Sequence, residues 1–257
     1  FIAQRDVWDG ARWAREVAAA VESKACGKVA LVGYHKDATS SYLDTFPEWT
    51  LIDAGRQGPL DATPLRERIL SRTEWREVEP ELRGKLPDPV LAWIARWARG
   101  ERRLELALDL ESVAAYRTRW GAGPFASADA VVKACGHVLL IRRGKRPGAG
   151  LRALPGGFLE PSESPEEGSR RELAEETGLE LDGLRATRQR LFDHPGRSER
   201  ARIATHAFLF EPEWARLPEV AGADDARDAR WIPIDEIPGM EAEFFEDHFH
   251  ILTQLLG

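Results

Sequence analysis

The first hundred residues alternate between short apolar runs and segments whose apolar residues recur every three or four positions. The apolar runs predict buried strands at 28–33 and 51–54. The periodic segments predict helices at 11–23, 63–70 and 87–99. Alternation of strand and helix indicates an α/β layer with parallel strands.

The second half of the chain begins after a long periodic segment, 101–120, which predicts a helix. Gly121-Ala122-Gly123-Pro124 follows as a boundary, and apolar runs on either side of Cys135-Gly136 predict a β-hairpin. A strand is expected at 204–211 and a closing helix at 246–256. The chain therefore divides into three expected parts: 1–100, a helical linker at 101–123, and 124–257.

One helix can be predicted with both of its ends. Ser164 is a favourable N-cap, Pro165 suits the first helical position, and Glu167 completes a Ser-x-x-Glu capping box. Gly178 supplies a C-terminal stop. We therefore expect a helix from 165 to 177.

Three carboxylates share one face of this helix. At 100° per residue, Glu172, Glu175 and Glu176 project within one sector of its surface. Like charges at this spacing repel one another and weaken a helix. A divalent cation would reverse the sign of that interaction, and Mg²⁺ prefers hard oxygen ligands that it shares with substrate phosphates.

Two further residues of the helix bear on such a site. Arg171 can reach Glu175 along the helix or fold back toward Glu163 in the preceding loop, and either contact would orient an acid. Gly168 lies one turn before Glu172, and its missing side chain would let a phosphate and its metal approach the backbone.

Composition and charge narrow the functional classes. The formal net charge of −7 argues against a general nucleic-acid surface. No run approaches the roughly 20 apolar residues that span a bilayer. The two cysteines, Cys26 and Cys135, lack the pattern of a disulfide framework, so a cytoplasmic location is expected.

The segment from Gly157 to Leu179 resembles the Nudix signature at every defining position: Gly, five residues, Glu163, seven residues, then Arg-Glu-Leu-Ala-Glu-Glu-Thr-Gly-Leu. That resemblance implies hydrolysis of a pyrophosphate linked to a nucleoside, in an α/β/α sandwich. It also implies that the carbonyl of Gly156 and the three helix acids hold Mg²⁺, or Mn²⁺ in its place. Glu163 and Arg171 would form a supporting pair, and Gly157 would face the substrate.

The residues around 192–208 and 222–233 resemble the ADP-ribose pyrophosphatase branch attached to bacterial NMN adenylyltransferases. In Nudix enzymes a late acidic residue often serves as base or extra ligand, which makes Asp224 and Asp225 candidates. Arg197 could clamp a diphosphate, because a guanidinium pairs well with phosphate. The family often forms homodimers.

The stretch from Gly33 to Trp49 resembles the nucleotidyltransferase domain of the same bifunctional family. Asp61 to Arg66 resembles its phosphate loop, so Thr63 and Arg66 would bind a triphosphate, with Lys36 and Asp37 near the nucleotides. The His-x-Gly-His motif of these transferases is absent and the chain has no initiator Met. We therefore expect the N-terminal part of that domain to be missing.

The predicted protein is an incomplete Rossmann-like nucleotidyltransferase region followed by a Nudix domain. Its predicted reaction, within NAD metabolism, is Mg²⁺-dependent hydrolysis of ADP-ribose, a small-molecule nucleotide, to AMP and ribose 5-phosphate. Two alternatives stay open. One is NMN adenylyltransferase activity once the missing N-terminus is restored, and the other is a Nudix module that senses ADP-ribose without cutting it.

Overall fold

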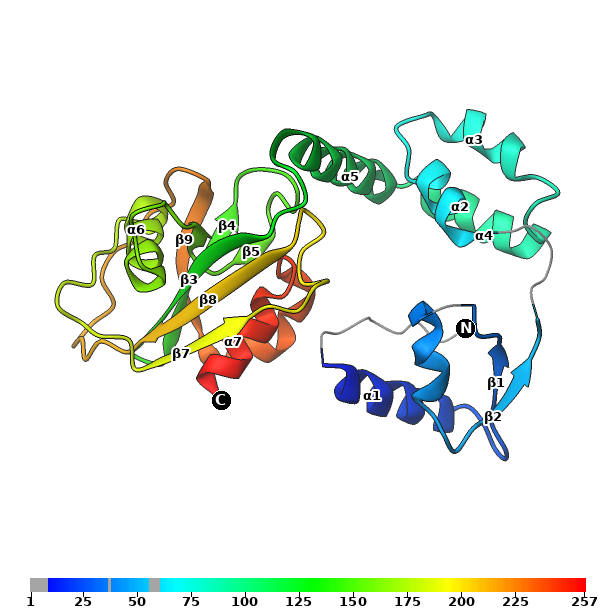
Figure 1. Ribbon diagram of the computed structural model, residues 1–257, viewed down its shortest axis with the longest axis horizontal. Coiled ribbons are helices and arrows are strands. Elements are labelled where there is room, and N and C mark those ends of the chain that lie inside the picture. Colours follow the sequence, from blue (N-terminus) through cyan, green and yellow to red (C-terminus); the bar gives the residue numbers. More distant parts are fainter. Residues whose placement is uncertain (1–8, 37, 56–60) are drawn as a thin grey trace. The chain divides into compact units, whose positions relative to one another are not determined.

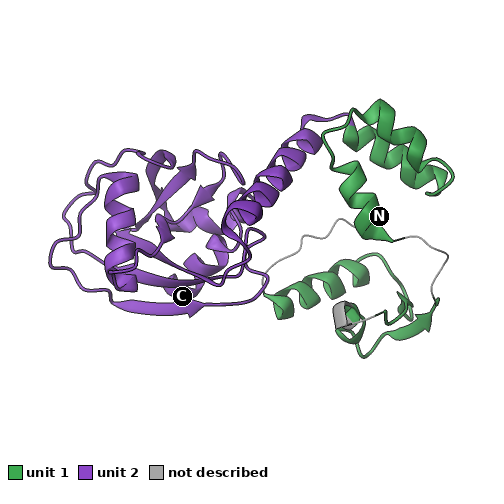
Figure 2. Cartoon of the chain, turned by 45° about the horizontal axis from the view of Figure 1, so that its top comes forward, with its two compact units in different colours: residues 1–98 green, residues 99–257 purple. Residues whose placement is uncertain are grey.

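The computed structural model describes residues 9–36, 38–55 and 61–257 of the chain. It separates into two compact units, residues 1–98 and residues 99–257 (Figure 2). Each unit has its own set of packed elements and is described by itself below.

The first unit opens with a small α/β layer. Helix α1 (Gly10–Glu22) is N-capped by Asp9, whose side chain accepts a hydrogen bond from the Arg12 N–H. Strands β1 (Ala30–Gly33) and β2 (Thr50–Asp53) pair in parallel, with the 3₁₀ helix η1 (Ala38–Asp44) in the connection between them. The parallel pairing expected from the strand–helix–strand alternation is confirmed.

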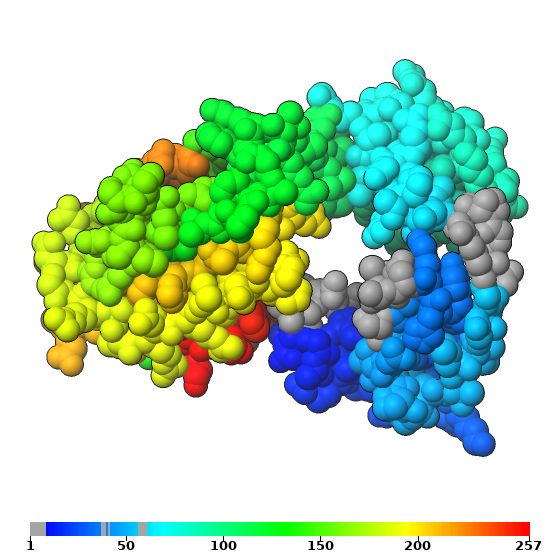
Figure 3. Space-filling model, in the orientation of Figure 1, coloured from blue at the N-terminus to red at the C-terminus, as the bar shows by residue number. Residues whose placement is uncertain are grey.

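The same unit continues as three short helices, α2 (Ala62–Ile69), α3 (Trp75–Leu82) and α4 (Asp88–Ala98). Figure 3 shows them in cyan as a close-packed group. Their shared core contains Trp75, Val78 and Leu82 from α3 and Leu91 and Ala95 from α4. The sequence analysis missed α3, which carries Pro80 in its interior, where proline removes a backbone donor.

The second unit is built on a seven-stranded mixed sheet. Strands β5, β4, β3, β8 and β7 follow one another in that order, while β6 pairs with β3 and β9 with β4. The predicted hairpin is the antiparallel pair β3–β4, and β3 pairs in parallel with β8 along the full length of β8. The strands span Phe125–Ala134 (β3), His137–Arg143 (β4), Arg152–Ala153 (β5), Gly156–Phe158 (β6), Arg188–Phe192 (β7), Ile203–Phe210 (β8) and Ala226–Pro233 (β9).

Helices cover both faces of this sheet (Figure 1). Helix α6 (Pro165–Thr177) packs through Leu173 into one core with β3, β4 and β8. Helix α7 (His248–Leu256) packs through Ile251 and Leu252 into a second core on the other face, after the 3₁₀ helices η2 (Ile234–Gly239) and η3 (Glu241–Glu243). The α/β/α sandwich predicted for this half is confirmed.

The helix expected as a linker, α5 (Glu101–Trp120), contacts two loops of the second unit. Arg146 donates to the Asp109 carboxylate at 2.7 Å, and Arg117 donates to the backbone carbonyls of Glu199 and Arg200. The structure therefore groups α5 with the residues that follow it. In the part of the chain that the structure describes, no helix is both long and apolar enough to cross a bilayer.

Candidate active site

Helix α6 has the ends that its sequence predicts. The Ser164 hydroxyl accepts from the Glu167 N–H at 3.4 Å, and the Glu167 carboxylate accepts from the Ser164 N–H at 2.8 Å. Gly178 ends the helix in the left-handed conformation at φ 70°, which glycine adopts without strain. Because both ends are fixed, the glutamates in the last two turns have a defined direction.

Arg171 holds three of the signature carboxylates together. Its guanidinium pairs with both oxygens of Glu163, at 3.0 and 2.7 Å, and reaches Glu172 and Glu175 at 2.9 Å each. It also donates to the Phe158 carbonyl at 3.0 Å. The two directions considered for Arg171 thus occur at once. The hydrogen bond from Arg171 also keeps the pKa of Glu163 below its ordinary value.

Glu176 and Glu172 lie on the sheet-facing side of the helix. Burial raises the pKa of Glu176 to about 8, although its carboxylate accepts a hydrogen bond from the Gly156 N–H at 3.0 Å. Burial also raises the pKa of Glu172, and Arg171 opposes that shift. Two desolvated carboxylates so close in sequence favour a positively charged partner.

Glycines let the strand β6 approach these acids. A Cβ on Gly157 would overlap the Glu172 carboxylate, and one on Gly156 would overlap Asp129. Gly168 differs from expectation, because the space its side chain would fill is taken by Leu159 and Glu163. The interpretation of Gly168 as an opening for phosphate is therefore wrong, since its role is to admit the supporting loop against the helix.

The donor set fits a hard divalent cation by its chemistry. Glu172, Glu175 and Glu176 offer carboxylate oxygens of the kind that Mg²⁺ and Mn²⁺ take. Among the described residues, no three Asp, Glu, His or Cys side chains are already arranged as a metal cage. Arg171 occupies oxygens of Glu172 and Glu175. A cation at these acids would therefore share them with Arg171.

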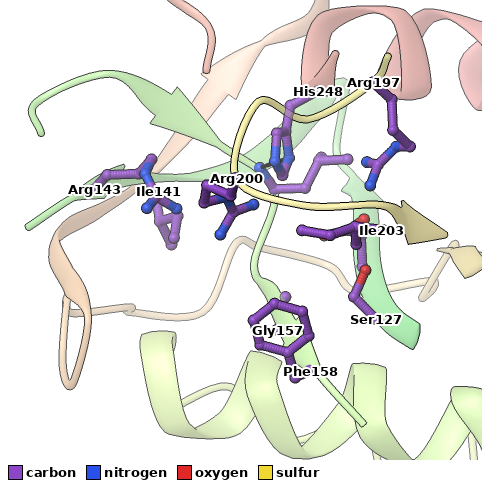
Figure 4. A pocket seen from close by; sticks show the side chains of 12 residues that line it. Ser127, Ile141, Arg143, Gly157, Phe158, Arg197, Arg200, Ile203 and His248 are labelled. Carbon is purple, nitrogen blue, oxygen red and sulfur yellow. Dashed lines mark hydrogen bonds between the residues drawn. The ribbon is translucent and has the colours of Figure 1, made fainter. Parts of the chain in front are cut away.

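A hollow of about 50 Å³ adjoins the acids through Gly156 and Gly157. That volume holds a few waters, and hence a group the size of a phosphate. In Figure 4 the guanidinium groups of Arg143, Arg197 and Arg200 lie along one side of it, and Phe158 lies on the other. The full lining is Ser127, Asp129, Ile141, Arg143, Leu154, Gly156, Gly157, Phe158, Arg197, Arg200, Ile203 and His248.

Asp129, Arg143 and His248 are among the polar residues of this hollow that were not singled out from the sequence as site residues. Burial raises the pKa of Asp129 to about 6, and its carboxylate accepts from the Thr205 hydroxyl at 2.6 Å. Burial lowers the pKa of His248 well below its ordinary value, and its Nδ1 accepts from the Leu154 N–H at 3.2 Å. Arg143 ends strand β4. None of the three belongs to a local motif, so only the pairing of distant segments could reveal them.

Arg197, the expected diphosphate clamp, is buried in an ion pair. Its Nε and Nη2 donate to the two oxygens of Asp247 at 2.9 and 2.8 Å. The side chains of Arg197 and Asp247 are only 3% and 4% exposed. A diphosphate at Arg197 would therefore compete with Asp247, and the clamp remains a prediction.

Asp224 and Asp225 lie on an exposed loop beside the end of α6. The loop is tied to the helix by the N–H of Ala223, which donates to the Glu176 carbonyl at 3.0 Å. Asp225 pairs with Lys145, whereas Asp224 adopts a positive φ of 49°. The negative charge of Asp224 contributes to the raised pKa of Glu172, which puts it within electrostatic reach of the acids.

The structure brings together part of the predicted nucleotide site in the first unit. Asp61 accepts from the Thr63 N–H at 3.0 Å and pairs with Lys36 at 3.3 Å. Arg66 is exposed on helix α2. Asp37 lies outside the described residues. The Asp61 carboxylate thus already caps the N-terminus of α2, where the triphosphate was expected to bind.

Comparison with known proteins agrees with this geometry. The sandwich and its glutamate-rich helix are those of the Nudix hydrolases, a class of enzymes that generally work with a divalent metal ion. The NUDIX domain model matches residues 123–255, just over half of the chain, so the chain belongs to the Nudix hydrolase family. The family resemblance inferred from residues 157–179 is confirmed.

One curated relative is an ADP-ribose pyrophosphatase of Methanocaldococcus jannaschii, 31% identical over 45% of this chain and 65% of its own. The chain thus spans less than two thirds of that relative's length.

A crystal structure of a bifunctional NMN adenylyltransferase/ADP ribose pyrophosphatase from Francisella tularensis is 30% identical. It covers 97% of this chain and 75% of its own, with a TM-score of 0.81. A structure of the Francisella tularensis enzyme complexed with AMP and Mn ion gives the same identity and coverage and a TM-score of 0.80. The resemblance to the bifunctional family is therefore confirmed.

Proposed function

We propose that this protein hydrolyses the pyrophosphate bond of ADP-ribose to AMP and ribose 5-phosphate in NAD metabolism, with Mg²⁺ as its cofactor. The observation that carries the proposal is the desolvated pair Glu172 and Glu176 beside a phosphate-sized hollow. The names of the relatives from Methanocaldococcus and Francisella support ADP-ribose as the substrate.

The reaction adds one water across the bridging P–O–P bond. The water oxygen bonds to one phosphorus, the bridging oxygen leaves with the other phosphate, and the two water protons end on the products or solvent. A bound divalent ion would activate the water and neutralise charge on the phosphoryl oxygens. Glu172, Glu175 and Glu176, with the Gly156 carbonyl, would hold it.

The chain's other residues orient these groups. Glu163 fixes Arg171, and Arg171 in turn fixes Glu172 and Glu175. Asp224 and Asp225 are the candidates for a late acid that assists proton transfer. Phe158, which is 37% exposed at the edge of the hollow, offers a ring face to an aromatic base.

A substrate panel tests this function. With Mg²⁺ present, the full chain is given ADP-ribose, NADH, diadenosine polyphosphates and nucleoside triphosphates, and the products are identified by ³¹P NMR. We expect AMP and ribose 5-phosphate from ADP-ribose, no turnover in EDTA, and a large loss in Glu176→Gln. Glu166→Gln is the matched control, because Glu166 pairs with Arg170 in the first turn of the helix. Brisk turnover of another compound with none of ADP-ribose would refute the substrate assignment.

The two alternatives remain predictions. Adenylyl transfer is favoured by the Francisella structure, which matches 97% of this chain and is described as bifunctional. It would be tested by NAD formation from NMN and ATP. Sensing without hydrolysis is less consistent with a complete set of signature acids. The predicted homodimer and cytoplasmic location also remain predictions.

A further inference from the structure

Three consecutive residues near the start of α7 position the three arginines of the hollow. Asp247 pairs with Arg197 at 2.8 Å, and Glu246 pairs with Arg200 at 3.0 Å. Phe245 lies beneath Arg143, whose guanidinium carbon is 4.0 Å from the ring centroid. Two of the three arginines are thus held by a carboxylate, and Arg143 is held by the Phe245 ring, which also lies 5.3 Å from the guanidinium carbon of Arg200.

Arg143 is therefore a cation without an acid of its own. Its Nε donates to the Pro147 carbonyl at 3.2 Å. In residues 9–36, 38–55 and 61–257, no carboxylate lies within ion-pair distance of its guanidinium. A largely desolvated guanidinium without a counter-ion costs folding free energy. Burial and the nearby charge of Arg200 accordingly lower the pKa of Arg143.

The other charged groups around Arg143 are already engaged. Asp129 accepts from Thr205, and the guanidinium whose charge acts on it most strongly is Arg197. Glu176 is held by the Gly156 N–H. The charges of Glu246, Glu176 and Asp225 all act on Arg143, and Glu246 acts most strongly of the three although it pairs with Arg200.

We propose that Arg143 binds a phosphate group of the nucleoside diphosphate substrate and that Phe245 is the residue that positions it. The inference rests on the proposed function, because it assigns a residue to that substrate. Arg143 lines a hollow of about 50 Å³ together with Gly156 and Gly157, and such a volume suits a phosphate. A guanidinium with free Nη groups binds phosphate oxygens in a two-pronged geometry that an ammonium cannot copy.

The test compares Arg143→Met and Arg143→Lys with the wild-type chain. Arg190→Met is the matched control, because Arg190 carries the same charge on β7 and pairs with Gln254 and the Phe192 ring. AMP, ribose 5-phosphate and inorganic pyrophosphate are titrated calorimetrically with Mg²⁺, and kcat and KM are measured with ADP-ribose. We expect Arg143→Met to weaken binding of AMP, ribose 5-phosphate or both by about 10- to 100-fold. The affinity of Arg143→Lys for these ligands should lie between those of Arg143→Met and wild type. The affinity of Arg190→Met should equal that of wild type.

Thermal stability separates binding from a structural role. Removing a buried cation that lacks a counter-ion should leave the Tm of Arg143→Met unchanged or raised, because only the ligand needs the charge. Phe245→Leu should release the guanidinium and raise KM more than it lowers kcat. A lower Tm for Arg143→Met together with wild-type affinity for all three ligands would overturn the proposal.

The proposed function can fail separately. If the wild-type chain does not hydrolyse ADP-ribose but its pyrophosphate affinity still falls in Arg143→Met, the substrate is wrong and the phosphate site stands. If ADP-ribose is hydrolysed and Arg143→Met binds and turns over like wild type, the phosphate site is wrong and the function stands.

Discussion

Replacing Arg197 with methionine distinguishes a structural ion pair from a substrate clamp. In the structure Nε and Nη2 of Arg197 donate to the two carboxylate oxygens of Asp247, at 2.9 and 2.8 Å. Both side chains are almost fully buried. Methionine retains the apolar stem and removes the charge. Asp247 is then left as a buried carboxylate with no partner.

The expected cost is about 3–5 kcal/mol of unfolding free energy, the range for breaking a buried pair from one side. Arg197→Met/Asp247→Leu should recover most of that loss, since no charge stays buried. Burial already raises the pKa of Asp247, and losing Arg197 should raise it further. A carboxyl with a raised folded pKa is protonated in both states at low pH. The deficit of Arg197→Met should therefore be smallest near pH 4 and grow as pH rises toward neutrality.

The assay must report on the second unit alone, because the chain has two units. Amide hydrogen exchange of the β3 and β4 core, followed in urea, gives that free energy in the full chain. Arg190→Met is the control for loss of one surface charge. A loss below about 1 kcal/mol with a raised KM for ADP-ribose would refute the structural interpretation and favour the clamp.

Two further changes probe the acids. Burial raises the pKa of Glu176 to about 8, so ionisation of this carboxyl lowers the stability of wild type as pH rises from about 4.5 to about 8, and Glu176→Gln lacks that contribution. In urea unfolding with EDTA, the unfolding free energy of Glu176→Gln should rise relative to that of wild type across this pH range, by at most about 5 kcal/mol. A difference in unfolding free energy that does not change with pH would contradict the burial argument. Gly157→Ala should push the Glu172 carboxylate aside and lower kcat at least about tenfold. Gly239→Ala, which meets open space, is its control, and equal kcat values would count against the close approach.

Local chemistry made the signature helix predictable from sequence. Ser164, Pro165, Glu167 and Gly178 act within a few residues of the helix ends, so neighbours in sequence decide where it begins and stops. The sharing of Arg171 among three glutamates is likewise contained in one helix and the loop before it. The sequence could therefore predict the acids and their direction.

The rest of the site could not be predicted from the sequence, because it depends on contacts between residues far apart in the chain. Asp129 and Thr205 meet because β3 and β8 run in parallel, 76 residues apart in the chain. Arg197 looked free because its partner, Asp247, lies 50 residues later. Strand β7 was missed because four of its five residues are exposed, which leaves little apolar alternation to detect. Such features depend on which segments become neighbours, and a single sequence does not state that.

The segment Phe245-Glu246-Asp247 has a consequence for the order in which the enzyme matures. During translation, α6 and its glutamates leave the ribosome well before this segment does, because they precede it by about seventy residues in the chain. Until the segment docks, Arg197 and Arg200 lack their carboxylate partners and Arg143 lacks the ring on which it lies. A nascent chain would therefore expose its acidic helix before its arginines could bind an anion. The ability to bind substrate phosphate would then form in one late step.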